Sequence, residues 1–158
     1  MIELKLAIIG LILSIVFSSA EIALITANKL QINVWIKQKY RLSLLTKNIL
    51  DQKSIYLIVC LIGTTLTNIL TSSFATAWLI NLNIIDTKII FIPIAAVILL
   101  FGEILPKTII REYSNVMLMY LSPLLWLSYF LFFPIVKLLD IFNLSKRKLF
   151  IERKKDIL

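Results

Sequence analysis

Four long apolar runs dominate the pattern of hydrophobic and polar positions along this 158-residue chain. They extend from Leu6 to Ile25, from Ile55 to Ile80, from Ile89 to Leu105 and from Val116 to Val136. Each approaches or exceeds the roughly 20 residues that an α-helix needs to cross about 30 Å of hydrocarbon. A small soluble domain has no core large enough for a chain that is 59% hydrophobic. We therefore predict an all-α integral membrane protein.

Lysine and arginine are distributed unevenly between these runs. Six lie between the first and second runs and seven follow the fourth, whereas Lys88 alone separates the second from the third. Because cationic connections stay in the cytoplasm, we expect a multi-pass protein of the cell membrane with its N-terminus outside and its C-terminus in the cytoplasm. The segment Ser18-Ser19-Ala20 resembles a signal-peptide cleavage site, but cleavage there would leave the six-cation loop outside, against this rule. The cations are not interleaved with aromatic residues, so we expect no nucleic-acid partner.

With that orientation, the fourth run begins and ends on the cytoplasmic side. Pro123 and Pro134 interrupt it, and proline removes a helical hydrogen bond. We predict three transmembrane helices plus a cytoplasmic juxtamembrane helical belt or re-entrant hairpin; the alternative is a fourth spanning helix. The first loop, 28–53, mixes apolar residues with lysines, and it predicts one or two short surface helices.

Polar residues form a stripe on each of the first two predicted helices. Ser14, Ser18 and Glu21 lie within an arc of about 60° at about 100° per residue. The second helix carries a stripe at spacings of three and four, composed of Thr64, Thr67, Asn68 and Thr71. Polar faces turn inward in lipid, although small hydroxyls also bond to their own helix or assist packing. We favour packing for Ser19, Ser72 and Ser73.

The sequence excludes several kinds of chemistry. It has no histidine and one cysteine, Cys60, inside an apolar run, which excludes a disulfide framework, a zinc site and histidine-based acid–base catalysis. Serine and carboxylate side chains occur without a facing base or second acid, so we expect no enzyme activity.

The third run ends in Gly102-Glu103-Ile104-Leu105-Pro106-Lys107-Thr108. Pro106 has no N–H to donate to the carbonyl four residues earlier, which belongs to Gly102. A bare carbonyl and the Glu103 carboxylate, with serine hydroxyls and the Asn68 amide, would make an all-oxygen pocket suited to Mg²⁺ or Na⁺. Lys107 is able to pair with Glu103 when no ion is bound, or with Glu21. The alternative interpretation of the whole motif is a proline kink that binds no ion.

Three motifs carry a family resemblance: SIVFSSAEIAL (14–24), GTTLTNI (63–69) and GEILPKT (102–108). In this order and spacing they resemble the transmembrane domain of the CNNM/CorC (CorB/CorC) family of magnesium transporters, over about residues 7–142. Residues 1–143 would form that domain and 144–158 a basic cytoplasmic tail. We expect the CBS-pair and CorC-type domains of the family to be absent here.

The resemblance implies a homodimer in the lipid bilayer, in agreement with the predicted three spans and belt. It also implies that Mg²⁺ is the transported ion, with efflux driven by Na⁺ entry. By motif position, the ion would be held by Ser14, Ser18, Asn68, Gly102 (through its carbonyl) and Glu103. Thr64 departs from the family pattern, in which asparagine is common at this position.

Two functions therefore stay open at the sequence level. The first is Mg²⁺ transport through an all-oxygen site within the membrane. The alternative is a non-transporting scaffold or accessory subunit whose polar stripes serve dimer packing.

Overall fold

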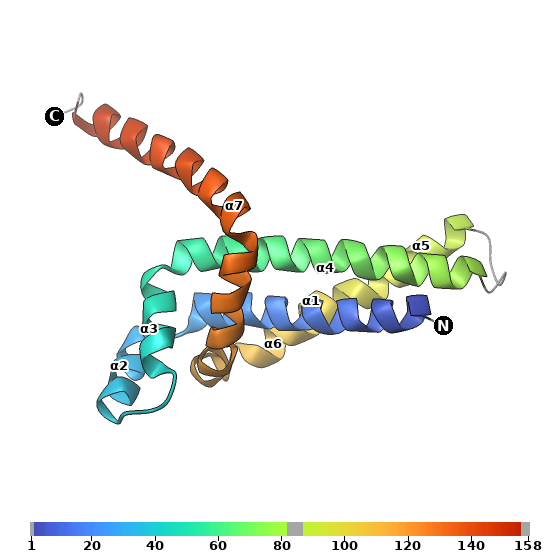
Figure 1. Cartoon of the computed structure of the whole chain (residues 1–158), viewed down its shortest axis with the longest axis horizontal. Coiled ribbons are helices and arrows are strands. Elements are labelled where there is room, and N and C mark those ends of the chain that lie inside the picture. The colour runs from blue at the N-terminus through green and yellow to red at the C-terminus, as the bar shows by residue number, and fades with distance from the viewer. Residues whose placement is uncertain (1, 82–86, 156–158) are drawn as a thin grey trace.

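The computed structural model describes residues 2–81 and 87–155, and the side chains of residues 2–81 and 92–137. The described residues form helices and short connections, with no β-strand among them. Figure 1 shows their arrangement; the helices are α1 (Ile2–Thr26), α2 (Lys29–Lys37), α3 (Ser43–Asp51), α4 (Lys53–Asn81), α5 (Thr87–Val97), the π-helical turn η1 (Ile98–Ile104), α6 (Leu105–Ile110) and α7 (Ser114–Lys155). The predicted all-α fold is confirmed. The connection between the second and third runs, 81–88, which the charge distribution places outside, lies largely beyond the described residues, as do the side chains of the basic tail, 144–158.

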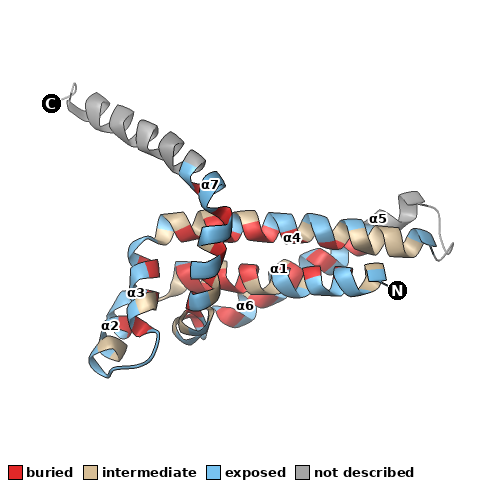
Figure 2. Cartoon of the chain, in the orientation of Figure 1, coloured by how far each residue is buried: buried red, intermediate tan, exposed pale blue. Residues whose placement is uncertain are grey.

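The helices α1 and α4 lie side by side in opposite directions and form the centre of the molecule (Figure 1). Small residues allow the close approach, because a Cβ added to Gly10 would stand 2.5 Å from Thr71 Oγ1 and one added to Gly63 would stand 2.6 Å from the Phe17 ring. Buried residues lie mainly where helices face one another (Figure 2). The outward faces carry large exposed apolar side chains, as a helix surface in contact with lipid requires.

The third apolar run forms one continuous rod with a change of helical register rather than a single regular helix. It passes from α5 through η1 into α6, and Pro93 lies inside α5. In Figure 1 this rod crosses behind α4 and α1. The rod extends to Ile110, five residues beyond the predicted end at Leu105.

The first loop forms two short helices, α2 and α3, as predicted from its mixed apolar and basic pattern. Asn28 caps α2, because its side chain accepts the Leu30 amide at 2.8 Å. Ile32 of α2 and Ile49 of α3 belong to the core that they share with α1, α4 and α7. A buried hydroxyl pair, Thr46 Oγ1 and Ser122 Oγ at 2.7 Å, fixes α3 against α7.

The fourth run forms a single helix, α7, which continues past both Pro123 and Pro134. The prediction of a re-entrant hairpin in this run is therefore wrong. The local reason is Ser122, whose hydroxyl donates to two carbonyls of its own helix, Met119 at 2.7 Å and Leu118 at 2.9 Å. The Met119 carbonyl is the acceptor that Pro123 leaves without its helical donor. A side chain thus replaces the missing backbone bond.

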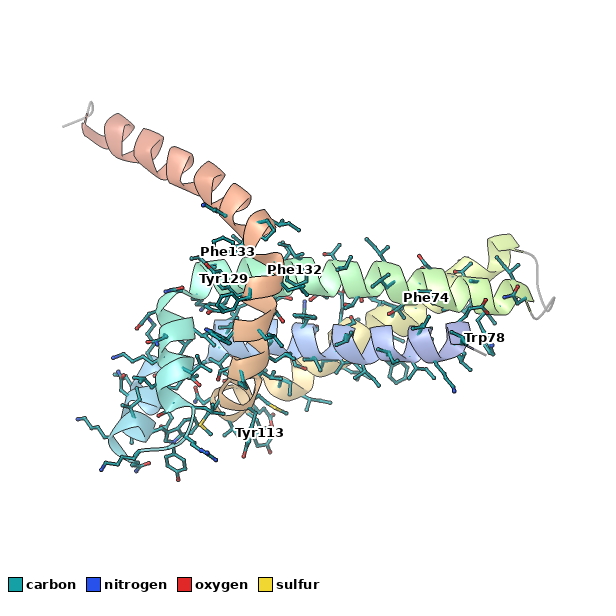
Figure 3. All side chains as sticks on the ribbon, viewed as in Figure 1. Phe74, Trp78, Tyr113, Tyr129, Phe132 and Phe133 are labelled. Carbon is teal, nitrogen blue, oxygen red and sulfur yellow. The ribbon has the colours of Figure 1, made fainter. Side chains whose placement is uncertain are left out.

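The helix α7 crosses α1 and α4 instead of running alongside them (Figure 1). At the crossing the Phe132 ring lies 6.4 Å from that of Phe17, and the Tyr129 ring lies 5.7 Å from that of Tyr56. Figure 3 shows Tyr129, Phe132 and Phe133 gathered there. By length and composition, four helices of the described chain are able to cross a membrane, and residues 114–137 are among them.

Candidate functional site

A chain of side-chain hydrogen bonds joins three helices near their middle. The Ser14 hydroxyl of α1 donates to Asn68 Oδ1 of α4 at 2.5 Å. The Asn68 amide in turn donates to Glu103 Oε1 of η1 at 2.7 Å. Ser14 is fully buried, whereas Asn68 and Glu103 are half-buried. One amide therefore connects a buried hydroxyl with a carboxylate across the helix bundle.

Ser18 and Gly102 complete the group of residues predicted to form the site. The Ser18 hydroxyl is fully buried and lies 3.5 Å from the Glu103 main-chain oxygen, a long hydrogen bond. Gly102 is buried against α1, and a Cβ added there would stand 3.0 Å from Ser14 Oγ. The side chain of Ser18 thus approaches the carbonyl one residue beyond the one that the sequence indicated. All five predicted residues are close to one another.

The helical register changes next to Gly102. The π register of η1 ends with the Leu105 amide bonded to the Leu100 carbonyl, five residues back, and α6 begins at Leu105. The Gly102 carbonyl falls at the junction of the two registers, opposite Pro106, which has no N–H. The widened turn brings Gly102 and Glu103 toward α1 and α4.

Lys107 pairs with Glu21 and not with Glu103. Its ammonium lies 3.1 Å from the Glu21 carboxylate, and the side chains are 35% and 25% exposed. This contact ties α6 to the last two turns of α1. Of the two partners that the sequence offered Lys107, the structure selects Glu21. Among the described residues, no cation lies within salt-bridge distance of Glu103.

The threonines of the predicted α4 stripe mostly serve their own helix. Thr64, Thr67 and Thr71 donate to the carbonyls of Cys60, Gly63 and Thr67, respectively, at 2.7–2.8 Å. Asn68 is the member of the stripe that bonds to side chains of other helices. Thr64, which stands where the family commonly has asparagine, therefore carries a hydroxyl that is already bonded to a carbonyl of α4.

A cavity of about 380 Å³ opens beside the hydrogen-bonded chain. Asn68 and Glu103 form part of its wall, Ser72 and Ser73 add two hydroxyls, and the remaining wall is apolar. The space exceeds the roughly 30 Å³ share of one water molecule many times over. The carboxylate therefore has room beside it for a cation with some of its hydration shell.

The arrangement offers oxygen ligands to a hard cation. Two serine hydroxyls, an amide oxygen, a backbone carbonyl and one carboxylate are the ligand types that Mg²⁺ accepts in proteins. Groups of three or more histidine, cysteine, aspartate or glutamate side chains able to hold a metal are not found in the described part of the chain.

Sequence reasoning did not predict the close contact of Ser14 with Gly102. A signal was present, because Gly10, Ser14 and Ser18 repeat at intervals of four, the small-residue spacing that lets membrane helices approach closely.

Apolar helices surrounding a hydrogen-bonded polar cluster define a multi-pass membrane protein with a polar site between its helices. The family model for the cyclin M (CNNM) transmembrane N-terminal domain matches residues 6–155. The chain therefore belongs to the CNNM transmembrane domain family, as the motif resemblance indicated. This family is associated with magnesium transport and is of a transporter type, not an enzyme family. A comparison with curated proteins found no match.

Proposed function

We propose that this chain transports Mg²⁺ through a site formed by Ser14, Ser18, Asn68, the Gly102 carbonyl and Glu103. The main support is the hydrogen-bonded chain from Ser14 through Asn68 to Glu103, beside a cavity of about 380 Å³. Ionisable groups within hydrocarbon are costly and generally face a cavity, an ion path or one another. Glu103 faces the cavity and has no described cation as its partner, so a bound Mg²⁺ would supply the missing charge.

In this proposal each residue has a distinct role. Glu103 supplies the negative charge, and the serine and amide oxygens replace water ligands of the ion. The Gly102 carbonyl is proposed as a ligand because glycine has no side chain and because Pro106 offers this carbonyl no hydrogen. Transport is proposed to be export driven by Na⁺ entry. Interrupted helices beside an intramembrane site are a recurring feature of transporters, and η1 interrupts the α-helical register here.

The assembly proposed is a homodimer. The cavity beside Asn68 and Glu103 lies on the flank of α4 and the α5–η1 rod, where lipid would otherwise face a carboxylate. A second copy of the chain over this flank would shield the site from hydrocarbon.

We further propose three membrane spans with α7 as a juxtamembrane belt at the cytoplasmic surface. The direction of α7 supports this, because a helix that crosses α1 and α4 lies along the membrane when those two stand across it (Figure 1). The aromatic residues Tyr120 and Trp126 are 66% and 47% exposed, which suits the interfacial depth.

The test is Mg²⁺ flux into proteoliposomes with and without a Na⁺ gradient, for the native chain and for Glu103→Gln. The substitution keeps an acceptor for the Asn68 amide and removes the charge, so we expect flux to fall at least tenfold. Glu3→Gln is the matched control, since Glu3 bonds to Asn81 at the far end of α1 and should leave flux unchanged.

Equal flux in Glu103→Gln and the native chain would refute the proposed site. Absence of Mg²⁺ movement in the native chain under any Na⁺ gradient would favour the alternative function, a non-transporting scaffold or accessory subunit. The glycines at helix contacts and the threonines bonded to their own helix are the observations on its side.

A further inference from the structure

The helices α2 and α3 form a hairpin that carries apolar side chains on its outer surface as well as its inner one. Its inner surface packs into the core through Ile32, Ile49 and Leu50, which are at most 3% exposed. The outer surface presents five more apolar or aromatic residues, 40–74% exposed: Leu30, Val34, Tyr40, Leu42 and Leu44. On α2, Leu30 and Val34 lie on the face opposite Ile32. Packing within the chain accounts for one face only.

The same hairpin is strongly basic. Residues 28–53 contain six cations and one acid, Asp51. Lys29 pairs with Asp51 at 3.0 Å, and Lys53 donates to the Ile25 carbonyl at 3.1 Å. The other four cations, Lys37, Lys39, Arg41 and Lys47, are exposed, and no carboxylate of the described residues lies within salt-bridge distance of them.

Short connections hold the hairpin at one end of the bundle. Only Ala27 and Asn28 separate α1 from α2, and the backbone N–H of Asn28 donates to Asn115 Oδ1 of α7 at 2.7 Å. At its other end, Gln52 alone separates α3 from α4. Figure 1 shows the hairpin at the end of the bundle where α1 ends and α4 begins. If α1 and α4 span the membrane, this is the end at which they leave the hydrocarbon.

We propose that the outer surface of the α2–α3 hairpin docks on the membrane and binds anionic phospholipid headgroups. Apolar residues beside lysines are the composition of a helix that lies in the interface, with its apolar side chains near the acyl boundary and its cations at phosphate groups. Charge complementarity favours anionic over zwitterionic lipid, because four cations lack a carboxylate partner in the described chain. It disfavours a second copy of the hairpin, since two such surfaces repel.

The native tryptophans allow a direct test. The chain has three, and Trp35 is the one in the hairpin. With Trp78→Phe and Trp126→Phe as background, Trp35 fluorescence is measured in bilayers that contain brominated phosphatidylglycerol or brominated phosphatidylcholine. The relative quenching gives the relative affinity of the hairpin for the two headgroups.

We expect a preference of at least about tenfold for phosphatidylglycerol, reduced as salt rises. A basic residue near an anionic surface contributes about 1 kcal/mol, or about fivefold in affinity, so Lys47→Gln should lower the preference up to about fivefold. Replacing all four unpaired cations by glutamine should abolish it. Lys5→Gln, an exposed lysine at the opposite end of α1, is the matched control and should change nothing. Unchanged thermal unfolding of each variant shows that the fold is intact.

Each other result overturns the proposal. Equal quenching by the two lipids would mean apolar docking without headgroup selection. Quenching by neither would place the hairpin away from the bilayer and leave its outer surface to a protein partner. The measurement involves no Mg²⁺, so its failure is independent of the proposed transport.

Discussion

Asn68 is the residue through which the polar groups of the three helices are connected. Asn68→Ala would leave the Ser14 hydroxyl and the Glu103 carboxylate without the partners they have now. Since a buried polar group left unpaired costs about 1–3 kcal/mol, we expect a loss of stability of that size. If the residue also holds Mg²⁺, the thermal stabilisation of purified protein by Mg²⁺ should disappear as well.

Thr65→Ala is the matched control for this prediction. Thr65 lies on the same helix, is exposed, and donates to the Leu61 carbonyl of its own turn. Its variant should unfold within about 0.5 kcal/mol of the native protein. The importance of Asn68 is contradicted if both variants unfold alike and keep the same response to Mg²⁺.

Gly102 and Ser14 are predicted to be energetically coupled. In Gly102→Ala the new Cβ would meet Ser14 Oγ at 3.0 Å, and overpacking of this kind costs about 1–3 kcal/mol. In the Ser14→Ala background that oxygen is gone and the nearest Ser14 atom is Cβ at 3.6 Å, so the same substitution should cost less. A double-mutant cycle from denaturant unfolding measures the difference, and strictly additive costs would argue against the contact.

At the scale of the element, the π-helical turn depends on Pro106. Pro106→Ala supplies an N–H that is able to bond with the Gly102 carbonyl and extend the α-helical register. We expect the protein to become more stable by about 1 kcal/mol or more, because an interior proline costs a helix about 3 kcal/mol. If the Gly102 carbonyl is a ligand, stabilisation by Mg²⁺ should weaken in the same variant.

Two measurements on one sample therefore separate the roles of Pro106. Thermal unfolding without Mg²⁺ reports the helix, and the added shift with Mg²⁺ reports the ligand. Gain of stability together with an undiminished Mg²⁺ response would remove the Gly102 carbonyl from the proposed site.

The prolines also show how far local sequence predicts an element. An irregularity next to Pro106 was predictable, because the missing hydrogen and Gly102 lie within one helical turn; the structure shows it as a change from the π to the α register. The continuity of α7 past Pro123 was not, because it depends on the bonds of the Ser122 hydroxyl to the Leu118 and Met119 carbonyls of its own helix. Ser122 also contacts Thr46 of α3, a contact between distant parts of the chain that the local sequence does not indicate.

A similar limit applied to the candidate site. Helical spacing placed Ser14 with Ser18, and the inward turn of polar faces placed both near Asn68 and Glu103. The sequence left Lys107 with two possible acidic partners, Glu103 four residues earlier and Glu21 on the first helix. Which of them pairs with Lys107 depends on the position of α1 along the η1–α6 rod, and contacts such as that of Gly102 with Ser14 set this position. The sequence contains the small residues but not the register they produce.

At the scale of the whole molecule, the exposed surface is dominated by apolar side chains and the interior contains the hydrogen-bonded polar groups. Apolar side chains thus lie on the outer surface as well as in the core of the described residues, which agrees with burial in lipid. The direction of α7 decides whether the chain has three spans or four. A third span followed by a belt leaves the two termini on opposite sides, whereas a fourth span returns the C-terminus to the side of the N-terminus.

Cysteine labelling distinguishes the two topologies, and the chain suits it because its one cysteine, Cys60, is fully buried. In a Cys60→Ala background, three single variants are compared: Glu3→Cys, Lys39→Cys and Leu158→Cys. We expect a membrane-impermeant thiol reagent to label Glu3→Cys in intact cells and the other two only after permeabilisation, because the cationic loop and the C-terminus are predicted to be cytoplasmic. Lys39→Cys calibrates the inner side. Labelling of Leu158→Cys in intact cells, with Lys39→Cys protected, would establish four spans and exclude the belt.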